Sequence, residues 1–201
     1  MNPLEPLLFR LPITHQAVLA ALTCEKMLPA ISRFDEPESK RGRPLFEEAI
    51  AAMLAFGLSR ALPITAYQQL QDQLAAFWPD LDKSDNDFAS YAFDACGALS
   101  EALLLVEEQG VAHLLNCLTA ATDTVDMYVQ DLQELTLSPG DLNAFIDASP
   151  TMKQERHRQQ VLTQELLERA ALDDEFLTHL RQLNEQAPLV DFARLPPDSC
   201  R

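Results

Sequence analysis

The sequence predicts an all-α protein, on three observations. Only five glycines occur in 201 residues, while Ala, Leu, Gln and Glu are abundant and β-branched residues are few, which favours helix over strand. Apolar residues recur at helical spacing in several long stretches, and no stretch alternates as a half-buried strand would. Proline, glycine and short polar runs separate these stretches. We therefore expect one domain, residues 1–201, built as a bundle-like array of six to seven helices.

Prolines and a capping residue delimit the helices of the first half. Thr14 is a candidate N-cap, and Pro29 is expected to kink or split the helix that follows, because proline removes a backbone donor. Pro44 lies where prolines commonly begin helices, Pro63 precedes a third helix, and Pro79 ends it. The predicted helices of this half are 14–34, 44–60, 65–78 and 87–109.

In the second half, Gly110 separates two long amphipathic stretches and is predicted to be the left-handed terminator between them. We expect these two helices to form a central antiparallel pair. Ser138-Pro139-Gly140 turns the chain into a short helix, and Ser149-Pro150 begins a long polar one with a break near Asp173. The predicted elements of this half are helices 111–135, 141–148 and 150–186, followed by an irregular tail, 188–201.

Charge and composition restrict the partners. A net charge of −16 repels phosphate backbones and anionic lipid surfaces, so we expect binding to neither nucleic acid nor membranes. The basic clusters Lys40-Arg41-Arg43 and Lys153-Arg156-His157-Arg158 are short and are interpreted as solvated faces or loops. The N-terminus lacks the features of a signal peptide, and the longest uncharged apolar run, 49–59, is too short to span a bilayer. A cytoplasmic location with reduced thiols is the expectation.

Common catalytic and cofactor signatures are missing. The glycines, at positions 42, 57, 97, 110 and 140, form no phosphate-binding or dinucleotide loop. The sequence has no Cys-x-x-Cys, His-Glu-x-x-His or Glu-x-x-His motif, so zinc and carboxylate di-iron sites are not indicated. We expect no cofactor and no tightly bound metal.

Glu25 is the most unusual single residue. On the first long helix it falls between Ala21 and Val18, inside an arc that also contains Leu22 and Leu28. A buried carboxylate costs several kcal/mol unless it is paired or protonated, so Glu25 requires a partner. It is either a member of a structural ion pair, which is the favoured interpretation, or a site carboxylate with a perturbed pKa.

Helix 87–109 carries a very wide apolar arc and only a narrow polar strip, which contains Asp94, Gly97 and Glu101. Such a helix is expected to be buried. The usual reason for a mid-helix glycine such as Gly97 is the close approach of another helix. Asp94 and Glu101 are separated by two turns, roughly 10 Å, which is too far for one metal ion. The strip is interpreted as solvated or as a row of ion pairs.

The cysteines and histidines give weak signals. Cys24 and Cys96 both fall on apolar faces, where cysteine usually acts as a small hydrophobic residue. His113 and Cys117 have i, i+4 spacing and are able to reach one metal ion, but two ligands do not make a zinc site.

Three stretches resemble the YjaG-like family of bacterial proteins of unknown function: Leu22-Thr23-Cys24-Glu25-Lys26-Met27 with Pro29, then 46–56, then Asp94-Ala95-Cys96-Gly97-Ala98-Leu99-Ser100-Glu101. The resemblance extends from Leu11 through the long C-terminal helix, although the C-terminal half matches mostly in helical character. It implies an all-helical, cytoplasmic bacterial protein without an assigned activity, and it supplies no catalytic residue. The proline-rich tail departs from the family pattern.

The leading hypothesis is a non-enzymatic, acidic helical module that acts through contacts with an unknown protein partner or with further copies of itself. The alternative is a small-molecule site or enzyme built on Glu25, Asp94 and Glu101 between the first and fourth helices. These differ in whether the three carboxylates meet at a concave pocket or are neutralised by Arg and Lys inside the bundle.

Overall fold

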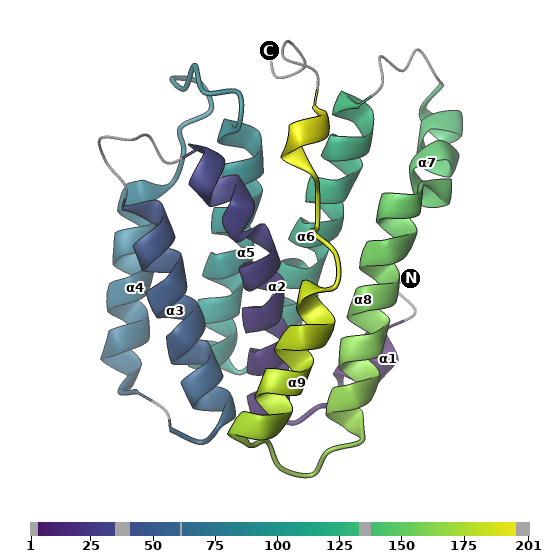
Figure 1. Ribbon diagram of the computed structural model, residues 1–201. Coiled ribbons are helices and arrows are strands. Elements are labelled where there is room, and N and C mark those ends of the chain that lie inside the picture. The colour runs from purple at the N-terminus through teal and green to yellow at the C-terminus, as the bar shows by residue number, and fades with distance from the viewer. Residues whose placement is uncertain (1–3, 35–40, 61, 133–137, 196–201) are drawn as a thin grey trace.

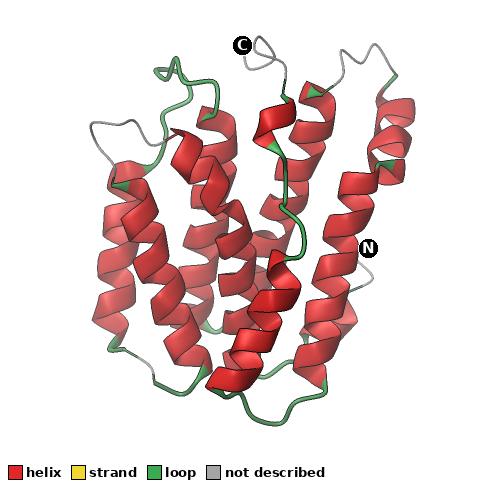
Figure 2. Ribbon diagram, in the orientation of Figure 1, coloured by secondary structure: helices red, strands yellow, loops and turns green. Residues whose placement is uncertain are grey.

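The structure, a computed structural model, describes residues 4–34, 41–60, 62–132 and 138–195. Within these ranges the chain is all-helical, with nine α-helices, one short 3-10 helix and no strand (Figures 1 and 2). The helices are α1 (Glu5–Leu8), α2 (Ile13–Phe34), α3 (Gly42–Gly57), α4 (Ile64–Phe77), α5 (Ala89–Glu108), α6 (Val111–Asp131), α7 (Pro139–Ala148), α8 (Pro150–Leu167), α9 (Asp174–Glu185) and the 3-10 helix η1 (Phe192–Arg194).

The predicted all-α class is confirmed, but six to seven helices are slightly too few. The sequence analysis did not recognise the four-residue helix α1, which has a proline in its first turn. The predicted long polar helix is two helices, α8 and α9. Asp173 begins the second one, because its Oδ1 accepts a hydrogen bond from the Phe176 backbone N–H at 2.8 Å, as an N-cap does.

Helix α2 is the centre of the bundle. Residues 15–24 are buried without interruption, and α3, α5, α6, α8 and α9 all pack against this helix (Figure 1). Helix α3 approaches especially closely: a Cβ on Gly57 would lie 2.3 Å from Cγ2 of Val18. Pro29 lies inside α2 without splitting it, since the helix continues to Phe34.

Helices α5 and α6 form the predicted antiparallel pair, although α2 takes the central position expected for them. Their connection differs from the prediction by one residue. Gln109, with φ 56° and ψ 32°, is the left-handed C-cap of α5, and its N–H donates to the Leu105 carbonyl at 3.0 Å. Gly110 is extended, with φ −97° and ψ 120°, and is the N-cap of α6. The helix therefore ends one residue earlier than the glycine suggested.

The part of the tail that the structure describes, 188–195, is packed rather than loose. Leu189 and Val190 are buried. The ring of Phe192 makes edge-to-face contacts with Phe88, at 5.4 Å between centroids, and with Tyr91, at 5.0 Å. This segment therefore covers the upper ends of α5 and α6 in Figure 1 and adds apolar contacts to the core.

Helix α5 is long and apolar enough to cross a membrane, and in the described part of the chain it alone meets that criterion. Its most apolar window is 61% buried inside the bundle. A core helix has the same composition, and the contacts of α5 with α2, α4 and α6 account for it.

Replacing Gln109 with glycine tests the position of the left-handed residue. A side chain in this conformation costs about 1–2 kcal/mol, so we expect Gln109→Gly to raise the free energy of unfolding by up to about 1 kcal/mol in urea denaturation. Gly110→Ala is the matched control and should change it by less than about 1 kcal/mol, because φ −97° suits any residue. The added Cβ would lie 3.3 Å from Cδ2 of His113, which requires only a small shift of that ring. If Gly110→Ala destabilises the protein and Gln109→Gly does not stabilise it, then Gly110, as the sequence predicted, and not Gln109, is the left-handed residue that ends α5.

Candidate functional site

A groove on the surface of the α5–α6 pair contains two of the predicted site carboxylates. We call it the acidic groove; its volume is about 280 Å³. Asp94 and Glu101 come from α5, Asp123 comes from α6, and the Trp78 and Phe93 rings lie at one side, 5.6 Å apart in an edge-to-face contact. The full lining is Trp78, Phe93, Asp94, Gly97, Ser100, Glu101, Asn116, Thr119, Ala120 and Asp123.

Asp94 is partly buried at the contact between the two helices. Thr124 donates a hydrogen bond from its Oγ1 to Oδ2 of Asp94 at 3.1 Å. Burial raises the pKa of Asp94 to about 6; the Thr124 hydrogen bond opposes the rise, and the charge of Asp123 adds to it. Burial and the neighbouring charge of Asp126 also raise the pKa of Asp123. In the described part of the chain, no basic nitrogen lies within 4.0 Å of either carboxylate.

Glu101, in contrast, is paired. His113 lies between two carboxylates, with Nδ1 2.7 Å from Glu101 and Nε2 3.0 Å from Glu108. Burial alone would lower the pKa of His113, but the hydrogen bonds and charges of Glu101 and Glu108 outweigh it and raise the pKa. The interpretation of the polar strip as an ion-pair row thus describes Glu101, while Asp94 is left without a cation.

Gly97 forms part of the groove floor, and the close helix approach predicted there is absent. A Cβ on Gly97 would meet only the Trp78 ring, at 3.9 Å, which is ordinary van der Waals contact. The glycine instead leaves open space beside the indole, so the neighbour that lies over it is a side chain and not a helix backbone.

Glu25 lies elsewhere, at the contact between α2 and α9. Its Oε1 accepts from Nη2 of Arg181 at 2.8 Å, and the two side chains are 21% and 42% exposed. The partner on another helix agrees with the ion-pair interpretation. Glu25 does not line the acidic groove, so the structure does not bring the three candidate carboxylates into one pocket.

The cysteines are buried thiols. Cys24, Cys96 and Cys117 are free and fully buried, and Cys200 lies outside the described residues. The hydrogen bond with Cys117, together with burial, raises the pKa of Cys24 well above its ordinary range, and burial raises that of Cys96 to about 12. Since a raised pKa keeps these groups as neutral thiols, Cys24 and Cys96 act as small apolar side chains.

His113 and Cys117 do not converge on a common metal position, because the ring of His113 is held by glutamates while Cys117 faces the Ala20 carbonyl of α2. More generally, no group of three or more metal-ligating side chains occurs within the described ranges.

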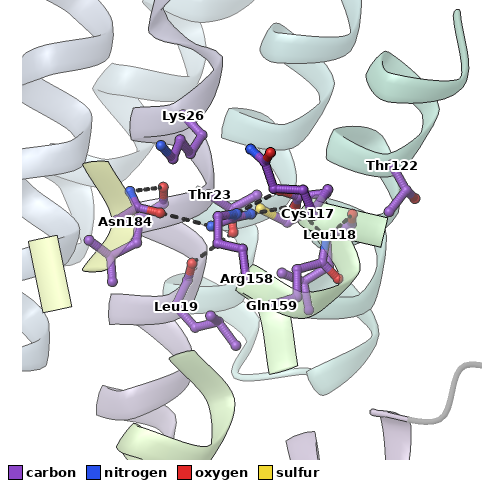
Figure 3. A network of polar contacts seen from close by, with 12 residues as sticks. Leu19, Thr23, Lys26, Cys117, Leu118, Thr122, Arg158, Gln159 and Asn184 are labelled. Carbon is purple, nitrogen blue, oxygen red and sulfur yellow. Dashed lines mark hydrogen bonds and ion pairs between the residues drawn. The ribbon is translucent and has the colours of Figure 1, made fainter. Parts of the chain in front are cut away.

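Sequence reasoning missed a buried polar network in which α8 meets α2, α6 and α9 (Figure 3). Arg158 and Glu155 form two hydrogen bonds, Nε to Oε2 at 2.6 Å and Nη2 to Oε1 at 2.5 Å, with side chains only 8% and 2% exposed. Asn184 accepts from Arg158 Nη1 at 3.0 Å and donates to the Leu22 carbonyl at 2.9 Å. Gln159 donates to the Leu118 carbonyl at 3.1 Å. Each polar side chain therefore has a defined partner.

This network corrects the interpretation of the second basic cluster as a solvated face. Lys153, Arg156 and His157 are exposed as expected, whereas the Arg158 side chain is buried. A signal for this was present in the sequence, because Glu155 and Gln159 fall at helical spacing on the apolar stripe of α8. The buried residues of that stripe are Met152, Glu155, Gln159, Leu162, Thr163 and Leu166.

Comparison with known proteins shows to which family the chain belongs. Residues 4–189 match the family model described as "Protein of unknown function (DUF416)". The chain belongs to the DUF416 family. The solved structure of a DUF416 family protein from Shewanella baltica OS155 is similar to it, with a TM-score of 0.80 and 19% sequence identity over 92% of this chain and 95% of that chain. At this identity the likeness shows the fold alone. The curated proteins contain no significant match.

DUF416 membership supports the expectation that no specific activity can be assigned from the sequence. The finer YjaG-like designation is compatible with it and stays a prediction.

Replacing Glu25 and replacing Glu155 should have very different effects on the free energy of unfolding. We expect Glu155→Ala to lower the free energy of unfolding by about 3–5 kcal/mol, since it leaves the buried guanidinium of Arg158 unpaired. Glu25→Ala should cost less than half as much, because the side chain of its partner Arg181 is 42% exposed and keeps access to water, although its Nε is buried. Urea unfolding of both variants measures the difference, and equal losses would contradict the assignment of Glu155 as the buried member.

Asp94 should make the free energy of unfolding fall as the pH rises, whereas a carboxylate in an ion pair makes it rise. The pKa of Asp94 in the folded protein, about 6, lies above the ordinary 3.8, so ionisation disfavours folding and stability falls as the pH rises from about 4 to 6. At pH 7.5, Asp94→Asn should be more stable than the parent by roughly 1–2 kcal/mol, with solvent screening of this partly exposed group included. The gain should vanish below pH 4, and a gain that does not depend on pH would contradict the raised pKa.

Proposed function

We propose that this DUF416 protein is a non-enzymatic interaction module that binds a basic segment of another protein in the acidic groove. A single observation supports this most strongly: the Asp94 and Asp123 carboxylates line an open groove with no basic group of the described chain near them. We retain the cytoplasmic location and the absence of nucleic-acid and membrane binding as parts of the same proposal.

The electrostatics of the groove favour a cationic occupant. Partial burial disfavours the ionised forms of Asp94 and Asp123 and raises the pKa of both. A lysine or arginine from a partner would supply the missing counter-charge, which lowers the free energy of the ionised pair.

The aromatic side of the groove favours a segment that is also apolar. Phe93 is 39% exposed although it is a large hydrophobic residue, and Trp78 packs against its ring. Such a pair offers an apolar anchor and a surface for cation–π contact, and aromatic residues are typical of the energetically important parts of interfaces. A short basic segment with one apolar anchor residue satisfies both features.

A partner of opposite charge is favoured over a second copy of this chain. With a net charge of −16, two copies repel one another, and the groove is acidic itself. Self-association through the acidic groove is the alternative to this proposal, and the experiment below distinguishes the two.

Photo-crosslinking in the source cell tests the proposal. A photoreactive phenylalanine analogue replaces Phe93 in the groove, and the matched control places it at Phe9, which is 61% exposed and outside the groove. We expect a crosslink from position 93 to one protein, at a segment rich in Lys and Arg. The Asp94→Asn/Asp123→Asn double variant should reduce its yield at least fivefold, as should added salt.

The control for charge is Glu48→Gln/Glu175→Gln, which removes two exposed carboxylates away from the groove and should leave the yield unchanged. Crosslinks to a second copy of the chain, or yields that do not respond to the Asp94 and Asp123 substitutions, would overturn the proposal.

A further inference from the structure

A second cavity has the opposite electrostatic character. It lies where α2, α8 and α9 meet the segment after α9, and its volume is about 290 Å³. Leu162, Leu183 and Leu189 are among its apolar lining residues, and its polar lining residues are Lys26, Gln154, Glu155, His157, Arg158, Asn184 and Gln186. It shares no lining residue with the acidic groove.

Of the two basic residues, Lys26 and Arg158, that line the cavity, Lys26 lacks a close counter-ion. Its ammonium donates to the backbone carbonyl of Ala187, and no carboxylate oxygen of the described residues lies within 4.0 Å of it. Burial lowers the pKa of Lys26 and the neighbouring charge of Arg158 lowers it further, although Glu155, Glu185 and Glu25 act in the opposite direction. A half-buried ammonium beside a guanidinium is therefore unfavourable as it stands, and an anion in the cavity would relieve this.

Arg158 cannot turn away from the cavity, because its guanidinium is fixed on three sides. Its Nε and Nη2 are held by Glu155, and its Nη1 donates to Asn184, which is itself anchored to the Leu22 carbonyl (Figure 3). Glu155 neutralises this guanidinium. Among the charged residues that line the cavity, Lys26 and Arg158 are positive and Glu155 is negative, so the lining carries one excess positive charge. Glu25, which is paired with Arg181, and Glu185 act on Lys26 from outside the lining.

We propose that this cavity binds a small organic carboxylate, whose carboxylate group pairs with the Lys26 ammonium and whose apolar tail lies along Leu162, Leu183 and Leu189. The single excess positive charge matches a monoanion better than a doubly charged phosphate. The apolar wall matches a hydrocarbon tail rather than a bare inorganic ion. The volume lies at the small end of ligand pockets, which span roughly 300–1,000 Å³, so the tail is short.

Titration with sodium hexanoate, followed by backbone amide NMR, tests the site in the full chain. We expect saturable, millimolar binding with the largest shifts at Lys26, Ala187 and Leu189. Hexan-1-ol is the matched neutral probe and should bind at least tenfold more weakly, and inorganic phosphate should not compete at equal concentration. Lys26→Gln should weaken hexanoate binding at least tenfold, whereas Lys153→Gln, on the exposed face of α8, should not change it.

A second readout needs no substitution and keeps the test decisive if Lys26→Gln does not fold. Hexanoate should raise the pKa of Lys26, followed through its side-chain carbon shifts, because a paired anion stabilises the ammonium; hexan-1-ol should not. The proposal is overturned if hexan-1-ol binds as tightly as hexanoate, if phosphate binds more tightly, if hexanoate leaves the Lys26 pKa unchanged, or if hexanoate shows no binding at about 20 mM, well above the expected millimolar Kd.

Discussion

The burial of α2 on all sides is the constraint on which the rest of the structure depends. A helix whose residues 15–24 are all inaccessible needs neighbours around its whole circumference, and five helices supply them. The small residues Ala17, Ala20 and Ala21 allow these neighbours to approach, and Gly57 allows the close approach of α3 at Val18. Because packed interiors tolerate few voids, the positions of α3, α5, α6, α8 and α9 follow from that of α2.

One of these neighbours, α8, is too polar to cover α2 by apolar contact alone. It therefore brings Glu155 and Gln159 into the interior, where an unpaired charge or amide would be costly. Arg158 and Asn184 offset this cost, because Arg158 pairs with the carboxylate of Glu155 and Asn184 donates to the buried Leu22 carbonyl of α2. Such a network stabilises one particular arrangement of α8 and α9, because a shift of either helix would leave several polar groups without partners.

The two surface cavities differ in the charge of the residues that line them. On the α5–α6 face, Glu101 is paired with His113, but Asp94 and Asp123 have no cation beside them, so the acidic groove favours a basic occupant. At the junction of α2, α8 and α9, the carboxylate of Glu155 is already used by Arg158, and the ammonium of Lys26 is left over. A strongly acidic protein thus keeps one small cavity whose lining carries an excess positive charge.

The sequence by itself determined the all-α class, the α5–α6 hairpin, the burial of Cys24 and Cys96, and the contact of Glu25 with a basic residue of another helix. These depend on local rules: helical periodicity, proline and glycine at helix ends, and the cost of a buried carboxylate. Only the tertiary structure decided the rest, namely which helix is central, that Asp94 shares a groove with Asp123 and Trp78 and not with Glu25, and that Glu155 is buried while its neighbour Arg156 is solvated. The physical reason is that burial and ion pairing depend on residues far apart in the chain. The 3.6-residue period places Glu155 on one face of α8. Whether the polar groups on that face are hydrogen-bonded inside the protein or exposed to water depends on distant residues such as Asn184 and Leu22.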